Sequence, residues 1–146
     1  MSRSLADRWL RVATIVTVAT GLVAAAASSE RGAGPWLLLF DVLEWPVDGS
    51  PERFTGETSA VNAVVGGVLV GWGTLMHLVV TGPFRRGDTT LATPMLLAVV
   101  AWFAVDSIGS FAADLPGNVV LNLGFLLLFV PPLVAIERPR SPGAAS

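Results

Sequence analysis

The chain contains no cysteine and no lysine, and it has a single histidine, His77. Without cysteine the protein cannot form disulfides, thiolate metal sites or a cysteine nucleophile. With one histidine it cannot build bis-histidine haem ligation, or the histidine clusters of membrane di-iron enzymes, within one chain. The sequence also carries no complete catalytic or metal-binding signature. We therefore expect no cofactor and favour a non-enzymatic protein.

Charged residues are scarce. They make up 14% of the chain, whereas a soluble domain carries about 25%. Hydrophobic residues make up 53% of the 146 residues, and the mean hydropathy is +0.68. The formal net charge is −2, and no basic stripe is present to neutralise phosphates, which argues against a nucleic-acid partner. The composition instead indicates a single domain whose main partner is the lipid bilayer.

Four apolar stretches are long enough to cross a membrane, for which about 20 residues are needed. None of them shows the sustained period-two alternation of membrane strands. The sequence therefore predicts an all-α, integral membrane four-helix bundle over residues 1–136. The tail, residues 137–146, is rich in proline, serine and alanine and is expected to be disordered and cytoplasmic. The four spans cover about residues 9–27, 60–81, 91–113 and 117–136.

Arginines are unevenly divided between the two sides of this bundle. Seven lie on the side that holds both termini and the loop between the second and third spans, whereas Arg31 and Arg53 lie on the other side. The positive-inside rule puts the arginine-rich side in the cytoplasm. We therefore expect a multi-pass protein of the plasma membrane with N-in/C-in topology. The seven residues are Arg3, Arg8, Arg11, Arg85, Arg86, Arg138 and Arg140.

The first apolar stretch has a second interpretation. Arginines followed by an apolar run and by the small residues 24–28 also describe a secretory signal with a cleavage site. Cleavage there would leave three spans, which pack less readily into a closed bundle. Both interpretations stay open at the level of the sequence.

The first outer loop, residues 28–59, is the longest connection in the chain. It contains an apolar segment between Pro35 and Pro46 that is too short to span a bilayer. Trp36 and Trp45 within it favour the boundary between water and lipid. We therefore expect a short interfacial helix here, or a segment folded over the outer mouth of the bundle.

The second span carries two stripes of small residues. Small residues four apart allow helices to approach closely in lipid, so this span is expected to supply a helix-packing surface. The alternative is that its glycines make room for a bound molecule. We expect Gly67 and Gly71 in particular to lie at a close helix contact. The two stripes are Asn62, Gly66, Gly73 and His77, and Ala63, Gly67, Gly71 and Thr74.

Three bulky side chains inside the spans have ordinary explanations. His77 lies near the inner end of the second span and is expected to be a packed, hydrogen-bonded residue rather than a ligand. Trp72 and Trp102 lie mid-span, where interfacial belts do not explain them, so we expect them to pack in the core.

Asp106 is the one acidic residue well inside a span. An acid at such a depth is energetically costly, so it usually faces the bundle interior and has a partner. Ser110 lies one turn away on the same face, Asn122 lies at a similar depth in the fourth span, and Asn62 enters the second span from the same side. We expect these four residues to converge in the outer half of the bundle. The cluster is then a structural hydrogen-bond network, a ligand or ion site, or the site of a catalytic acid.

The region from Glu57 through Val134 resembles small bacterial and archaeal membrane proteins of the DoxX-like group. The resemblance is carried by Glu57, by the glycine-rich segment 60–73, by the turn 83–86 and by the segment 106–110. It covers a little over half of the chain and implies a prokaryotic four-helix bundle, with little about activity. The chain departs from the small multidrug exporters, because its first span lacks their membrane-embedded glutamate.

These observations support two functions. The leading one is a non-enzymatic accessory subunit or small-molecule binder with an outward-facing polar pocket. Its partners would be lipid and other membrane subunits or further copies of the chain. The alternative is an oligomeric transporter or channel that uses Asp106. The ligand-binding residues expected in either case are Asp106, Ser110, Asn122 and Asn62.

Overall fold

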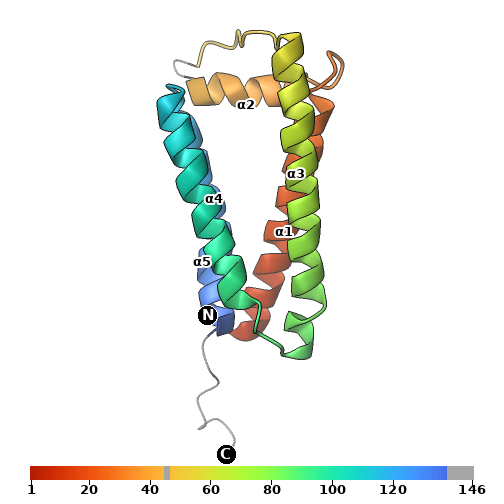
Figure 1. Cartoon of the computed structure of the whole chain (residues 1–146), viewed down its shortest axis with the longest axis vertical. Coiled ribbons are helices and arrows are strands. Elements are labelled where there is room, and N and C mark those ends of the chain that lie inside the picture. The colour runs from red at the N-terminus through yellow and green to blue at the C-terminus, as the bar shows by residue number, and fades with distance from the viewer. Residues whose placement is uncertain (45–46, 138–146) are drawn as a thin grey trace, which may run out of the picture.

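A computed structural model describes residues 1–44 and 47–137, and over these residues the protein is all-α (Figure 1). Four of its helices are long and apolar enough to cross a membrane, which confirms the prediction of an all-α chain with four such helices. A shorter helix, α2, and one turn of 3-10 helix, η1, complete the fold. The elements are α1 (Arg3–Ala26), α2 (Gly34–Glu44), α3 (Gly56–Thr81), η1 (Phe84–Arg86), α4 (Ala92–Ala112) and α5 (Pro116–Glu137).

Capping residues explain why the long helices begin before the apolar runs do. The side chain of Ser2 accepts a hydrogen bond from the backbone nitrogen of Leu5 at the start of α1, at 3.3 Å. Thr55 does the same for Thr58 at the start of α3, also at 3.3 Å. These bonds satisfy backbone donors that have no partner within the helix. Pro116 takes the first position of α5, where its fixed φ suits a helix and its missing N–H is not needed.

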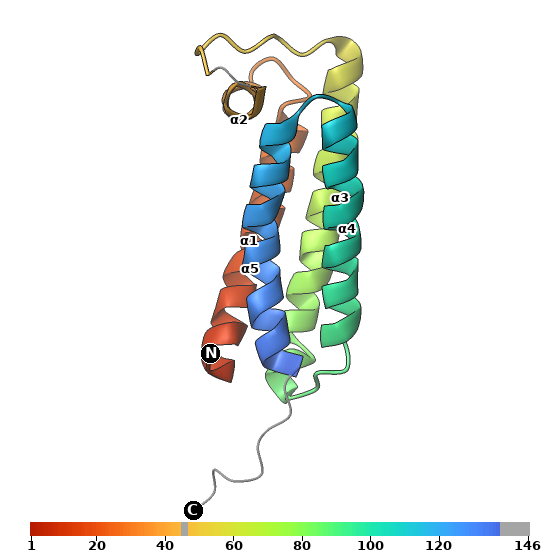
Figure 2. The ribbon, with the colours of Figure 1, turned by 90° about the vertical axis from the view of Figure 1, so that its left-hand side faces the viewer.

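The bundle consists of two helix pairs. Helix α3 packs along α1, and α4 packs along α5, while the contact between α1 and α5 joins the pairs. In Figure 1 the pairs lie closest near η1 and diverge toward α2, which lies across the opposite end. Figure 2 shows the same arrangement from the side. We call these two ends of the bundle the η1 end and the α2 end.

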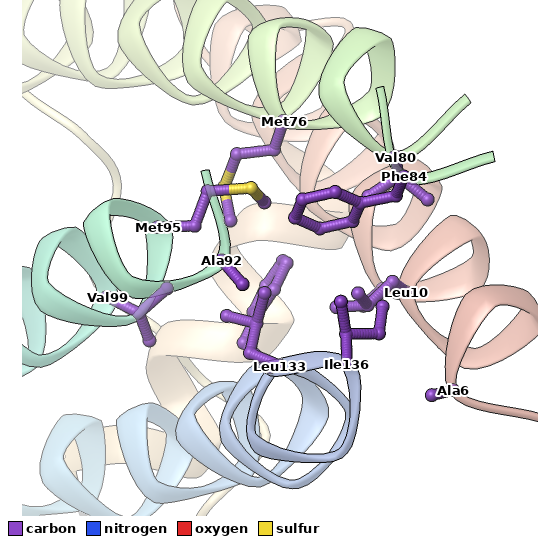
Figure 3. Packing of buried hydrophobic residues seen from close by; sticks show 12 residues of the cluster. Ala6, Leu10, Met76, Val80, Phe84, Ala92, Met95, Val99, Leu133 and Ile136 are labelled. Atoms are coloured by element: carbon purple, nitrogen blue, oxygen red, sulfur yellow. The ribbon is translucent and has the colours of Figure 1, made fainter. Parts of the chain in front are cut away.

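The apolar core lies at the η1 end, where side chains from α1, α3, η1, α4 and α5 point toward one another (Figure 3). Phe129, Leu10 and Leu133 are its largest fully buried members. Helices in lipid gain little from the hydrophobic effect, so close packing of this kind is what joins them. The core residues are Ala6, Leu10, Ala13, Met76, Val80, Phe84, Ala92, Met95, Val99, Phe129, Leu133 and Ile136.

A three-residue turn precedes α4 at this same end. The Oδ1 atom of Asp88 accepts hydrogen bonds from the backbone nitrogen of Thr90 at 3.0 Å and from its hydroxyl at 2.7 Å. The pKa of the exposed Asp88 carboxyl lies below its usual value, and the largest cause is the hydrogen bond from the Thr90 backbone. The hydroxyl bond and the charge of Arg86 lower it further. The turn is therefore fixed by local bonds while its charged group stays in water.

The α1–α3 contact is made by a different stripe of glycines from the one expected. A Cβ atom on Gly66 would overlap the backbone of α1, at 2.6 Å from the carbonyl oxygen of Gly21, and one on Gly73 would lie 2.9 Å from Val18. By contrast, a Cβ on Gly67 or Gly71 would meet nothing within 4 Å. The expectation that Gly67 and Gly71 lie at a close helix contact is therefore wrong, because their side of α3 points away from α1.

His77 belongs to the same contact face as Gly66 and Gly73. Its Nδ1 atom lies 2.9 Å from the hydroxyl of Thr14 on α1, within hydrogen-bond distance. The bond joins two helices inside the bundle, as expected of a packed histidine.

One boundary differs from the prediction, since Glu137, expected in the tail, is the last residue of α5. The rest of the predicted disordered tail, 138–146, lies outside the described residues, as does Trp45.

The two glycine stripes provide a matched test of this contact. We expect Gly66→Ala to destabilise the protein by about 1–3 kcal/mol, because the added methyl group forces α1 and α3 apart. Gly67→Ala should leave stability unchanged or slightly raised, since alanine is the better helix former and meets open space. Thermal unfolding of both variants in detergent measures the difference. Equal losses of stability would contradict this assignment of the contact face.

Candidate functional site

A hydrogen-bond network surrounds Asp106 in the half of the bundle nearest α2. Its Oδ1 atom accepts bonds from Nδ2 of Asn118 at 2.9 Å, from Nδ2 of Asn122 at 3.1 Å and from the hydroxyl of Ser110 at 3.1 Å. Asn118 Nδ2 also donates to the Ser110 hydroxyl at 2.8 Å. Three neutral donors therefore converge on one carboxylate oxygen, and none of the hydrogen bonds among the described residues uses Oδ2.

The antiparallel α4–α5 hairpin explains why these four residues meet. Asp106 and Ser110 are four apart on α4, and Asn118 and Asn122 are four apart on α5, so each pair occupies one helix face. The chain reverses at Asp114, which adopts a left-handed conformation with φ of 53°. The reversal sets Asn118 beside Ser110 and Asn122 beside Asp106. Sequence spacing and the short turn together build the network.

The network borders a cavity of about 240 Å³. The cavity lies between the two helix pairs where they diverge, and α2 covers it. Asp106 is the single formally charged residue among those that line it. The lining residues are Thr20, Trp36, Leu39, Phe40, Leu43, Val61, Asn62, Val65, Leu69, Trp72, Trp102, Asp106, Leu115, Asn118, Leu121, Asn122 and Phe125.

Helix α2 forms the roof of this cavity and bridges the two helix pairs. Near its start, Trp36 donates from Nε1 to the Oδ1 atom of Asn62 on α3, at 3.2 Å. Near its end, Leu43 presses on α5, because a Cβ on Gly117 would lie 2.8 Å from the Leu43 Cα atom. Asp41 is buried and accepts bonds from the backbone nitrogens of two loop residues beyond the helix. The roof is thus held at both ends and tied to the loop that follows it.

Asn62 reaches the cavity but not the Asp106 network. Its side chain is 5% exposed, and its oxygen is occupied by Trp36. Its Nδ2 group is buried and has no hydrogen-bond partner among the described residues. A buried donor without a partner costs about 1–3 kcal/mol. An N–H donor of this kind, on a side chain that lines a cavity, is suited to an acceptor atom on a bound molecule.

Of the four expected site residues, Asp106, Ser110 and Asn122 are brought together by direct hydrogen bonds. Asn62 shares only the cavity with them. Glu57, an acidic residue in the first turn of α3, is exposed and does not line the cavity. Sequence reasoning did not include Asn118, although its four-residue spacing from Asn122 was a usable signal.

The tryptophans are the second group that sequence reasoning did not assign to the site. Trp72 and Trp102 were expected to pack in the core, and their rings do contact each other, with centroids 5.7 Å apart. They also line the cavity together with Trp36, which we had assigned to the membrane boundary. The pattern of the sequence gave no signal for the direction in which Trp36 points.

The polar groups around Asp106 are hydrogen-bond donors to its carboxylate. Catalysis by an acid requires a nucleophile or base activated by a neighbour, and the groups around Asp106 are amides and a hydroxyl that donate to it. Among the residues that the structure describes, no cluster of histidine or acidic side chains suits a metal ion. One carboxylate, several amides and a set of aromatic rings form the site.

The importance of the network can be measured by removing its central acceptor. Asp106→Leu should destabilise the protein by about 1–3 kcal/mol, because the amide groups of Asn118 and Asn122 lose their shared acceptor. Asp106→Asn keeps an oxygen in that position and should stay close to the wild type in stability. Val105→Leu, at a residue that is 74% exposed, is the matched control. A wild-type unfolding temperature for Asp106→Leu would contradict a stabilising network.

Comparison of the chain with family models, with curated proteins and with solved structures found no match. The resemblance to the DoxX-like group therefore stays a prediction. Function has to be argued from the geometry of the site itself.

Proposed function

We propose that this protein is a multi-pass protein of the plasma membrane that binds a small molecule in the cavity beneath α2. The α2 end faces the outside of the cell, and α2 lies at the outer boundary of the membrane. Asp106 and Asn62 supply the polar contacts to the ligand, while Ser110, Asn118 and Asn122 hold the Asp106 carboxyl in position. The protein acts by binding and not by catalysis.

The observation that carries this proposal is the buried Nδ2 donor of Asn62. It has no partner among the described residues and belongs to a side chain that lines the same cavity as Asp106. A buried asparagine that served only to pack two helices would have its donors satisfied within the protein. Here the Asn118 and Asn122 donors are satisfied by Asp106, whereas the Asn62 donor remains available. A ligand with an acceptor atom would complete the site.

The apolar core favours a binding site over a transporter or channel. Phe129 and Leu133 are fully buried at the η1 end, and they lie with other apolar side chains from all four long helices. A continuous polar path from Asp106 would have to cross this core. The described part of the chain therefore supports a pocket that is closed on the η1 side.

The proposed orientation rests on the arginines. Five arginines lie at the end of the bundle opposite α2. Near the start of α1 these are Arg3, Arg8 and Arg11, and in η1 they are Arg85 and Arg86. Arg31 and Arg53 lie at the α2 end. The bias of arginine toward cytoplasmic loops supports an outward-facing α2.

Topology reporters test this orientation. A reporter that is active only in the cytoplasm should be active when fused to either terminus, and inactive when inserted after Gly49, in the loop between α2 and α3. A terminus that reports from outside the cell would contradict the proposed topology. A mature N-terminus located after residue 27 would contradict four retained spans.

Binding in the cavity is tested by blocking it. Leu121 lines the cavity from α5, whereas Leu123, two residues along the same helix, does not line it and is 45% exposed. Wild-type protein and Leu123→Trp, purified in mild detergent, should carry the same small molecule, identified by mass spectrometry of the extracted protein. Leu121→Trp should have lost it, since the larger side chain occupies the space. Identical extracts from all three proteins would contradict the proposal.

A further inference from the structure

The aromatic rings around the cavity form two separate layers. Trp72, Trp102 and Phe125 form a floor on the side of the η1 end, with ring centroids 5.7 Å apart for the two tryptophans and 6.0 Å apart for Trp102 and Phe125. Trp36 and Phe40 form a roof on α2, with ring centroids 6.1 Å apart. The faces of aromatic rings carry partial negative charge and attract cations, tryptophan most strongly.

Asp106 stands in the wall between these two layers. It lies one turn from Trp102 on α4, in the direction of α2. All its side-chain hydrogen bonds come from neutral groups, and no lysine or arginine lines the cavity. In the described residues the one ion pair is between Asp7 and Arg11, which lie in the first turns of α1 at the η1 end. No basic side chain therefore lines the cavity to pair with the Asp106 carboxyl.

The segments at the α2 end, which include α2 itself and the start of α3, are rich in acidic residues. Acidic residues there outnumber the two arginines, Arg31 and Arg53. A surface of one sign raises the local concentration of ligands with the opposite charge. The acids are Glu30, Asp41, Glu44, Asp48, Glu52, Glu57 and Asp114.

The size of the cavity limits its occupant. A volume of about 240 Å³ lies below the roughly 300–1,000 Å³ of pockets that hold drug-sized ligands, so the occupant is a smaller molecule. The lining is mostly aromatic and aliphatic, which disfavours a fully hydrated metal ion. The occupant therefore needs hydrocarbon groups as well as charge.

We propose that the ligand is a small organic cation, such as a substituted ammonium compound, held between the aromatic floor and roof with its charge toward Asp106. The Oδ2 atom of Asp106 faces the charge, while Oδ1 stays bonded to the asparagines. The buried Nδ2 donor of Asn62 takes an acceptor atom of the ligand where one is present. This proposal rests on the proposed function and adds the chemical class of the ligand.

The test compares a cation with a neutral molecule of the same shape. Benzyltrimethylammonium and neopentylbenzene differ in the replacement of one charged nitrogen by carbon. Their binding to wild-type protein in nanodiscs is measured by equilibrium dialysis against empty nanodiscs, with quenching of tryptophan fluorescence as a second readout. We expect the wild type to bind the cation at least about tenfold more tightly than the neutral molecule, about 1.4 kcal/mol at 25 °C.

Matched variants identify the groups responsible. Asp106→Asn should weaken cation binding at least about tenfold and leave the neutral molecule unaffected, whereas Asp114→Asn should change neither by more than about twofold. Asp114 is an exposed acid at the same end of the bundle that does not line the cavity. Trp102→Leu should lower the preference for the cation while leaving the Asp106 carboxyl in place. It serves as a second variant in case Asp106→Asn folds poorly. Circular dichroism checks the helix content of each.

The outcomes separate this inference from the proposed function. Equal binding of both probes to the wild type, unaffected by Asp106→Asn, would overturn the cation while leaving a small-molecule site. Cation binding that survives in Leu121→Trp would show a site elsewhere and would overturn the inference. A failure of both probes to bind, with a co-purified molecule still lost in Leu121→Trp, would overturn the ligand class alone.

A lipid headgroup presents the same ammonium chemistry as a free compound. Nanodiscs of phosphatidylglycerol alone can be compared with nanodiscs that also contain phosphatidylcholine. Reduced binding of benzyltrimethylammonium in the presence of phosphatidylcholine would identify the headgroup as an occupant. Unchanged binding would identify a free compound. Both results support the ligand class, and they distinguish its source.

Discussion

The apolar core at the η1 end is the contact on which the rest of the structure depends. Lipid tails are as apolar as the side chains of the spans, so the helices are joined by packing and by polar bonds instead of the hydrophobic effect. Here the packing that involves every long helix is gathered at one end. The α1–α3 and α4–α5 pairs can then diverge toward α2 (Figure 1). The divergence leaves space at the other end, where polar groups and aromatic rings line a cavity.

Fixing the register of α4 against α5 does not by itself explain why residue 106 is an acid. Two asparagine amides and a serine hydroxyl satisfy one of its oxygens. An asparagine at 106 would offer the same amides an oxygen acceptor at a smaller energetic cost, because a neutral side chain is cheaper to hold within a membrane than a charged one. The structure retains the acid in the wall of a cavity. The proposed role in recognising charge would give this acid a function that packing alone does not.

The sequence predicted a structural feature correctly where a single property of the residues, such as hydropathy, determines that feature. Hydropathy and length were enough for the four spans, and depth together with residue type was enough to join Asp106, Ser110 and Asn122. Spacing was less informative, because helical periodicity shows which residues share a face but not what that face meets. Gly66 and Gly67 are adjacent and chemically identical, yet one touches the backbone of α1 and the other meets open space. That difference depends on how α1 and α3 are rotated, which tertiary packing alone determines.

Trp36, in helix α2, is a second residue whose neighbours could not be predicted from the sequence. Its amphipathic ring suits the boundary between water and lipid, and a short apolar helix suits it as well. What turns the ring inward is the buried oxygen of Asn62 on a different helix, which needs a donor and receives one from Nε1. The opposite end of α2 is fixed by its contact with Gly117 on α5. Helix α2 thus forms a roof, because each of the two diverging pairs makes one contact with it.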